Sequence, residues 1–111
     1  MAVRDFYIVL TADPADNAEV TVQPAGTVEA VIHALEWGTG GTDPTQIEVY
    51  RCHAGGDDLI MDGDEYPALN FPQGYVGGLE LYVNNSYYLK IKNVAGDAKT
   101  FIAALGMTTH A

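Results

Sequence analysis

Acidic residues are concentrated in one short segment of this 111-residue chain. Five carboxylates fall within nine residues there: Asp57, Asp58, Asp62, Asp64 and Glu65. Calcium takes six to eight oxygen ligands, so such a cluster could hold a hard cation. The helix–loop–helix calcium pattern needs acidic residues at alternate positions before its glycine, and apolar residues stand there instead. We therefore interpret the segment as a solvated acidic hairpin tip and leave cation binding open.

The three histidines are not spaced as ligands of one metal ion. His33 falls inside one expected strand, His53 ends another, and His110 stands next to the last residue. Cys52 and His53 are adjacent, and adjacent residues in a strand point to opposite faces. Because Cys52 is the only cysteine, neither an intrachain disulfide nor a thiolate zinc cluster can form. We expect no metal and no cofactor.

Groups for nucleophilic catalysis are also scarce. Ser86 is the only serine, and it stands in an Asn-Asn-Ser-Tyr turn without the glycine elbow that exposes a hydrolase serine. Cys52 would need a neighbouring base and a positive setting to become a reactive thiolate. Paired carboxylates of the glycosidase kind stay open, but a domain this small has little room for a water-excluding cleft. We expect a protein that is not an enzyme.

The composition limits the class of partner. Fifteen acidic residues against five basic ones give a net charge of −10, so phosphate backbones and anionic membranes would be repelled. No apolar run approaches the roughly 20 residues of a membrane helix, and Asp5 interrupts the N-terminal segment where a signal peptide would be apolar. We expect neither nucleic acid nor membrane as a partner, and a single domain over residues 1–111.

Alternating apolar and polar residues predict strands along the whole chain, with turns between them. The expected strands are 5–11, 19–23, 28–37, 46–53, 58–61, 79–83, 87–93 and 100–107. Their spacing of about 8–12 residues is typical of a sandwich or barrel. We predict an all-β fold, an antiparallel β-sandwich or jelly-roll-like barrel of about eight strands with little or no helix. Asp62-Gly63 and residues 84–86 are expected to close hairpins, and 66–75 to cross irregularly.

Segment 28–37 is apolar on both faces, as is segment 5–11. One face of 28–37 carries Val28, Ala30, Ile32 and Ala34, and the other carries Val31, His33, Leu35 and Trp37. A strand in a small antiparallel domain normally has one dry face, so the second apolar face predicts contact with another subunit. The residues expected at that interface are Tyr7, Val9, Val31, His33, Leu35 and Trp37.

Two stretches carry a family resemblance. Residues 20–35 read as a strand, a Pro-Ala-Gly turn and a long apolar strand, and 82–106 carry Tyr-Val-Asn-Asn-Ser-Tyr-Tyr-Leu-Lys-Ile-Lys-Asn before a last Ile-Ala-Ala-Leu-Gly strand. Together they resemble the small β-sandwich virion proteins of tailed bacteriophages, the capsid decoration (cement) and head-fibre class. The chain is expected to depart from some members by lacking a long N-terminal arm, since Arg4 already adjoins the first strand.

The resemblance implies a non-enzymatic structural protein that decorates and stabilises a bacteriophage capsid. Its expected partners are the major capsid protein and further copies of itself, as a homotrimer. It would be made in the host cytoplasm and end on the capsid surface of the virion. The alternative is a carbohydrate-binding β-sandwich module for host recognition, because the chain has seven tyrosines, three phenylalanines and Trp37. That alternative predicts a row of exposed aromatic rings with Asp62 and Asp64 nearby.

Overall fold

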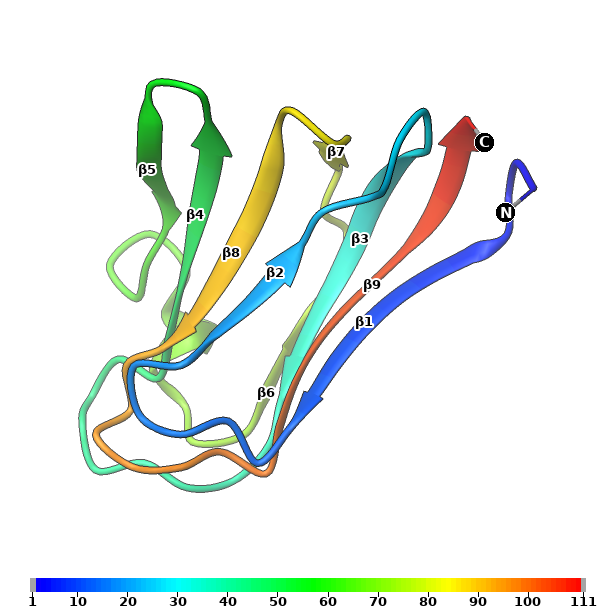
Figure 1. Ribbon diagram of the computed structural model, residues 1–111. Coiled ribbons are helices and arrows are strands. Elements are labelled where there is room, and N and C mark those ends of the chain that lie inside the picture. Colours follow the sequence, from blue (N-terminus) through cyan, green and yellow to red (C-terminus); the bar gives the residue numbers. More distant parts are fainter. Residues whose placement is uncertain (1, 111) are drawn as a thin grey trace.

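The computed structural model describes residues 2–110 and confirms the predicted all-β sandwich. Its nine described strands form two antiparallel sheets packed face to face (Figure 1). Sheet A runs in the order β1 (Phe6–Ala12), β9 (Phe101–His110), β3 (Glu29–Trp37), and then β6 (Gly74–Val76) and β7 (Leu81–Val83), which both pair with β3. Sheet B runs β2 (Glu19–Val22), β8 (Tyr88–Asn93), β4 (Ile47–His53) and β5 (Gly56–Met61).

The core lies between the sheets and follows the alternation of the strands. In β2 and β8 every second residue is buried, and the residues between them face water, as expected for sheets with one solvated side. Completely buried side chains from both sheets meet there: Val22, Leu89, Ile91, Ile47 and Val49 from sheet B, and Ile32, Leu35, Trp37 and Ala104 from sheet A.

A β-bulge in β3 changes which side chains enter this core. Ile32 pairs with Gly106 and Ala34 pairs with Leu105, so His33 has no partner residue on β9. One unpaired residue shifts the alternation by one position. Before the bulge the even-numbered residues face the core, and after it the odd-numbered residues, including Leu35, do so.

Gly106 allows the bulge to form. A Cβ at this position would lie 2.1 Å from the backbone oxygen of Val31, far inside contact distance. Because the obstacle is backbone rather than a flexible side chain, only glycine fits while β3 and β9 keep this spacing.

Two predicted hairpins are wrong. Residues 79–83 and 87–93 do not pair, because β7 joins β3 in sheet A and β8 joins β2 and β4 in sheet B. Asn84 still closes the turn, since its Oδ1 accepts the N–H groups of Ser86 (2.9 Å) and Tyr87 (2.7 Å). The turn predicted at residues 84–86 is therefore present, but the strands on its two sides, β7 and β8, belong to different sheets.

The acidic segment does not form a hairpin tip. The β4–β5 hairpin turns instead at Ala54-Gly55, where His53 pairs with Gly56. After β5, the Oδ1 of Asp62 accepts the N–H of Asp64 (3.0 Å) and closes a turn on the way to the crossing segment. That segment, expected to be irregular, contains the 3₁₀ turn Pro67–Asn70 and the short strand β6.

A buried lysine joins the loops at one end of the sandwich. Lys99 is 1% exposed, and its ammonium group donates to the Gln46 Oε1 (2.6 Å) and to the backbone oxygens of Gly40 and Pro72. Three donors thus meet three acceptors, two from the loop between β3 and β4 and one from the loop before β6, which satisfies the cation without a carboxylate. Burial lowers the pKa of Lys99 from its ordinary value.

Candidate protein-contact surface

Strand β1 turns a row of large apolar side chains toward solvent. Tyr7 and Val9 point inward and pack on the core, so the residues between them must point outward. Phe6, Ile8 and Leu10 are accordingly 77%, 57% and 62% exposed. No Asp, Glu, Lys, Arg or Pro occurs within β1, so nothing on this strand offsets the apolar character of the row.

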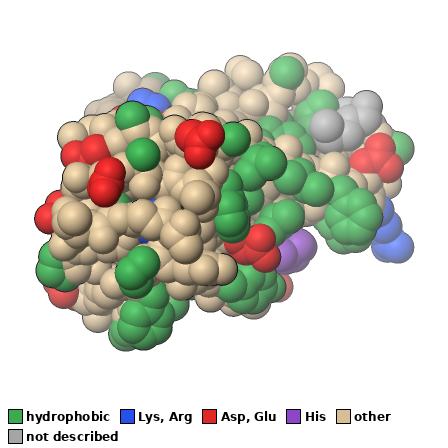
Figure 2. Space-filling view, turned by 90° about the horizontal axis from the view of Figure 1, so that it is seen from below, with side chains coloured by type: hydrophobic (Ala, Val, Ile, Leu, Met, Phe, Trp, Pro, Cys, Tyr) green, Lys and Arg blue, Asp and Glu red, His purple; other side chains and the backbone are tan. Residues whose placement is uncertain are grey.

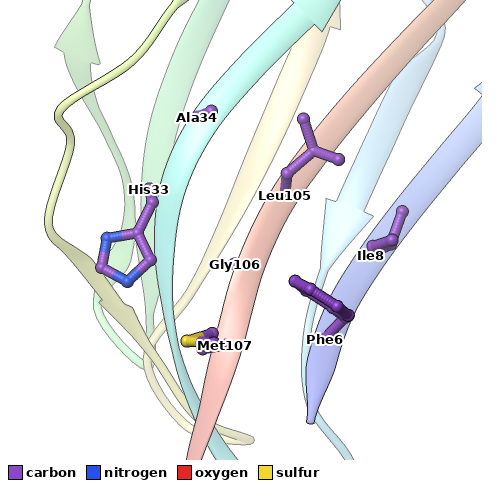
Figure 3. Close-up of a pocket in the computed structure, with 7 residues that line it drawn as sticks. All are labelled: Phe6, Ile8, His33, Ala34, Leu105, Gly106 and Met107. Carbon is purple, nitrogen blue, oxygen red and sulfur yellow. The ribbon is translucent and has the colours of Figure 1, made fainter. Parts of the chain in front are cut away.

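The central strands of sheet A extend this row into a wider surface. The outward residues Leu105 and Met107 of β9 lie beside it, and His33 and Ala34 of β3 follow. The surface is hollowed to about 380 Å³, and the side chains that line the hollow are drawn in Figure 3. Its lining is Phe6, Ile8, His33, Ala34, Leu105, Gly106 and Met107. We call these residues, together with Leu10, the apolar face of sheet A.

His33 is the polar member of the apolar face, and two hydrogen bonds with Leu79 hold it in place. A carbonyl oxygen can only accept, so the Nδ1–H of His33 donates to the Leu79 oxygen at 3.0 Å. The Leu79 N–H in turn donates to the His33 oxygen, also at 3.0 Å. These bonds lie between the part of β3 that pairs with β6 and the part that pairs with β7. They hold the imidazole at the border of the apolar face, with Nε2 as the remaining polar atom of the ring.

Charged side chains are absent from the lining of the hollow although the chain carries a net charge of −10. In the view from below, hydrophobic side chains gather beside a histidine (Figure 2). A neighbouring hollow of about 790 Å³ shares His33 and Met107 and adds Val31, Arg4 and Glu80. The surface is therefore apolar at its centre and mixed at its border, as protein interfaces are.

Three of the six predicted interface residues lie in the core instead. Leu35 and Trp37 have no exposed surface, and Tyr7 is 9% exposed, so all three belong to the core of the protomer. The bulge turns Leu35 and Trp37 inward, and strict alternation along 28–37 could not reveal it. Val9 is partly buried against the core, whereas Val31 and His33 do lie on the outer side of sheet A.

The exposed residues of the apolar face were not among the predicted interface residues. Phe6, Ile8 and Leu10 alternate with the predicted Tyr7 and Val9, and segment 5–11 was recognised as apolar on both sides. The signal was therefore present, but the wrong set was assigned to the outside. In segment 100–107 the large residues Leu105 and Met107 likewise alternate with the small residues Ala104 and Gly106. This difference in size between the two sides of the strand was a signal for the exposed side.

The acidic cluster is divided among separate structural contacts. Asp58 Oδ2 lies 2.8 Å from His53 Nε2, and Asp57 Oδ2 lies 3.3 Å from Lys90 Nζ. Asp62 closes the turn after β5. Within residues 2–110, no group of three or more His, Cys, Asp or Glu side chains is arranged to hold a metal ion.

Neither candidate nucleophile lies in a reactive setting. Cys52 is completely buried, and burial, followed by the adjacent Asp57 carboxylate, raises the pKa of its thiol to about 11. The thiol is therefore protonated at neutral pH. Ser86 stands in the exposed Asn84 turn. No helix in the described part of the chain is long and apolar enough to cross a membrane.

Comparisons with known proteins add little. No protein-family model matches the chain, and no curated protein matches it. Among solved structures, one similar chain is described as the crystal structure of FLHE, with 12% identity, 99% of this chain and 100% of that chain covered, and a TM-score of 0.38. This likeness is too low to carry information about fold or function.

Proposed function

We propose that the protein is a non-enzymatic structural protein that binds the surface of another protein through the apolar face of sheet A. The observation that carries the proposal is the exposure of Phe6, Ile8 and Leu10 in one row beside the hollow. Scattered apolar residues are normal on protein surfaces, but a contiguous apolar patch with a polar border marks an interaction site.

The specific role we propose is the one that the family resemblance implies, decoration of a bacteriophage capsid. The partner would be the major capsid protein, and the bound protein would lie on the capsid surface of the virion. A capsid offers many identical sites, so a modest contact can be strengthened by avidity. A strong negative charge keeps the unbound protein soluble at high concentration, which suits a component that is added to a finished shell.

The test is co-sedimentation of the purified chain with capsids assembled from a bacteriophage major capsid protein. We expect saturable binding that the double variant Phe6→Ser, Met107→Ser reduces at least tenfold, a change of about 1.4 kcal/mol. Tyr87→Ser is the matched control, because Tyr87 is 56% exposed and lies in the Asn84 turn, outside the apolar face.

Circular dichroism must show that all variants keep the wild-type spectrum. Absence of saturable binding by the wild type would refute capsid decoration. Equal loss of binding in Tyr87→Ser would refute the assignment of the contact to the apolar face.

A second hollow supports the carbohydrate-binding alternative at a different place. It measures about 480 Å³ and brings Tyr75 and Phe101 together with Glu36 and Gln73. Tyr75 is 59% exposed, and an aromatic ring beside amide and carboxylate groups suits a sugar, which offers an apolar ring face and hydroxyls. Trp37 also borders this hollow but has no exposed surface, so it cannot supply the stacking ring.

A glycan array tests this alternative. We expect any hit to be abolished by Tyr75→Ala and retained by Tyr87→Ala, because the two tyrosines are similarly exposed, at 59% and 56%, but only Tyr75 lines the hollow. An array without hits, or one on which both variants lose binding equally, would refute the site.

A further inference from the structure

Strand β1 is an edge strand without the features that usually prevent edge pairing. It forms one border of sheet A and pairs only with β9 (Figure 1). Natural edge strands are kept short, charged, proline-containing or covered. The other edges follow this rule, since β2 has four residues, β6 and β7 have three each, and β5 carries Asp57 and Asp58. By contrast, β1 has seven residues and no charge.

The hydrogen bonds of sheet A show which residues face the free edge. In an antiparallel pair, alternate residues direct both N–H and C=O toward the partner strand, and the intervening residues direct them away. Asp13 donates its N–H to the Thr100 oxygen, and Asp5 accepts the N–H of Thr108, both at 2.9 Å. Odd-numbered residues of this segment therefore bond to β9.

It follows that Phe6, Ile8 and Leu10 direct their backbone N–H and C=O groups to the open side of the sheet. Among the described residues, the loops and turns supply no backbone partner for these three. The residues with the free backbone groups are thus the same ones whose apolar side chains are exposed.

We propose that two copies of this chain pair through the free edges of β1, about a twofold axis at Ile8. The pairing sets Ile8 against Ile8 of the second copy and Phe6 against Leu10, and it joins the two A sheets into one. A twofold contact uses the same surface on both subunits, and an antiparallel strand whose free-edge residues are all apolar is complementary to itself.

The charges at the ends of β1 favour this register over the one with the twofold axis at Val9. Because opposite residues lie on the same face of a sheet, the register can change only in steps that keep even-numbered residues opposite each other. A twofold axis at Val9 would oppose Phe6 to Ala12 and place Asp5 opposite Asp13, and like charges directly opposite are destabilising. The axis at Ile8 places Asp5 opposite Thr11 instead.

The proposal does not depend on the proposed function. Edge pairing uses the backbone of β1 and leaves Leu105 and Met107 open, so the doubled sheet would present two apolar faces side by side. Because both copies are strongly acidic, repulsion opposes the pairing, and salt that screens this repulsion should tighten the dimer.

Variants with one cysteine added, in a chain whose own Cys52 is completely buried, test both the contact and its register. At the twofold position, Cα atoms of a hydrogen-bonded pair lie about 5.5 Å apart, within the roughly 4.4–6.8 Å range of disulfides. We expect Ile8→Cys to form a disulfide-linked dimer at least tenfold faster than Leu10→Cys. Leu10 is the matched control, since the two residues are 57% and 62% exposed but Leu10 would lie four residues from its own copy.

Light scattering over a range of concentrations gives the second measurement. We expect a dimer that dissociates on dilution, that is weakened at least tenfold by Ile8→Pro, and that is unchanged in Leu105→Ser. Proline at position 8 removes an N–H from the free edge and none that bonds to β9. The homotrimer expected from the family resemblance predicts a different mass.

The proposal would be overturned by a chain that remains a monomer at high micromolar concentration, or by a trimer that Ile8→Pro leaves intact. It would also be overturned if Ile8→Cys links no faster than Leu10→Cys. If Ile8→Pro fails to fold, the cysteine pair still decides. Loss of capsid binding in Leu105→Ser with an intact dimer would support the proposed contact of the apolar face with the capsid and would leave the pairing through β1 unaffected.

Discussion

Truncation of Trp37 tests whether this residue belongs to the core or to an interface. The sequence predicts it at an interface, whereas the structure buries it in the core. The indole is 0% exposed, and its Nε1–H donates to the Phe71 oxygen at 2.8 Å. It also lies against Gly74, where a Cβ would come within 2.3 Å of the ring. We therefore expect Trp37→Ala to destabilise the folded protomer itself.

The expected loss follows from burial more than from the hydrogen bond. Truncation of a completely buried tryptophan to alanine costs about 3–5 kcal/mol through lost apolar contact and the remaining cavity. Phe71 is 60% exposed, so water can reach its carbonyl region, and the bond adds only about 0.5 kcal/mol, the low end for such bonds. A domain of this size has about 5–15 kcal/mol of stability in total, so the variant should lose a large fraction of it.

Urea unfolding followed by far-ultraviolet circular dichroism measures this loss. Indole fluorescence cannot be used, because Trp37 is the only tryptophan. With a slope of about 1–3 kcal/mol per molar urea, the midpoint should fall by roughly 2 M. Phe6→Ala is the control, since a side chain that is 77% exposed should change the stability of the protomer by less than about 0.5 kcal/mol.

The reasoning would be refuted if Trp37→Ala kept the wild-type midpoint at a concentration where the chain is monomeric. It would equally be refuted if the loss vanished on dilution, because stability that depends on protein concentration comes from association. Either result would restore Trp37 to the interface predicted from the sequence.

Three further predictions use other buried groups. Gly106→Ala should lower the free energy of unfolding by about 1–3 kcal/mol, measured by urea, because its Cβ would meet the Val31 oxygen at 2.1 Å, whereas Met107→Ala on the outer face should cost less. Lys99→Met should cost at least about 1–3 kcal/mol, the penalty for one buried acceptor left without a donor, and a wild-type melting temperature would contradict this. The Cys52 thiol has its pKa raised from 9.0 to about 11 in the folded state, so its contribution to stability is complete below pH 9 and is lost as pH rises toward 11. The decline should be shallower in Cys52→Ala, and identical pH profiles of unfolding would refute it.

The strands and the fold class could be predicted because alternation is a local signal. Eight segments were expected, and each overlaps an observed strand; only β6 was missed, a three-residue strand inside the crossing segment. Turn chemistry was also legible, since Asn84 caps its turn with two side-chain bonds. Which strands pair after a turn depends on contacts distant in sequence, so the two hairpin predictions failed.

The candidate surface was less predictable for a specific physical reason. One unpaired residue at His33 reverses the alternation for the rest of β3, and the cause is the absence of a side chain at Gly106, more than seventy positions later in the chain. No property of segment 28–37 by itself reveals such a partner. The buried Lys99 was missed for the same reason, because its three acceptors come from loops that only the fold brings together.

The two strands that are apolar on both sides, β1 and β3, thus differ in whether their large outer side chains are buried or exposed. In β3 the bulge sends Leu35 and Trp37 into the core, and the small Ala34 remains on the outer side as part of the hollow. In β1 there is no bulge, so Phe6 and Ile8 stay outside while Tyr7 fills the core. A central strand has neighbours on both sides to cover its backbone, but an edge strand does not. The apolar surplus of the chain is therefore exposed on β1, on the same residues that direct their backbone N–H and C=O groups to the free edge.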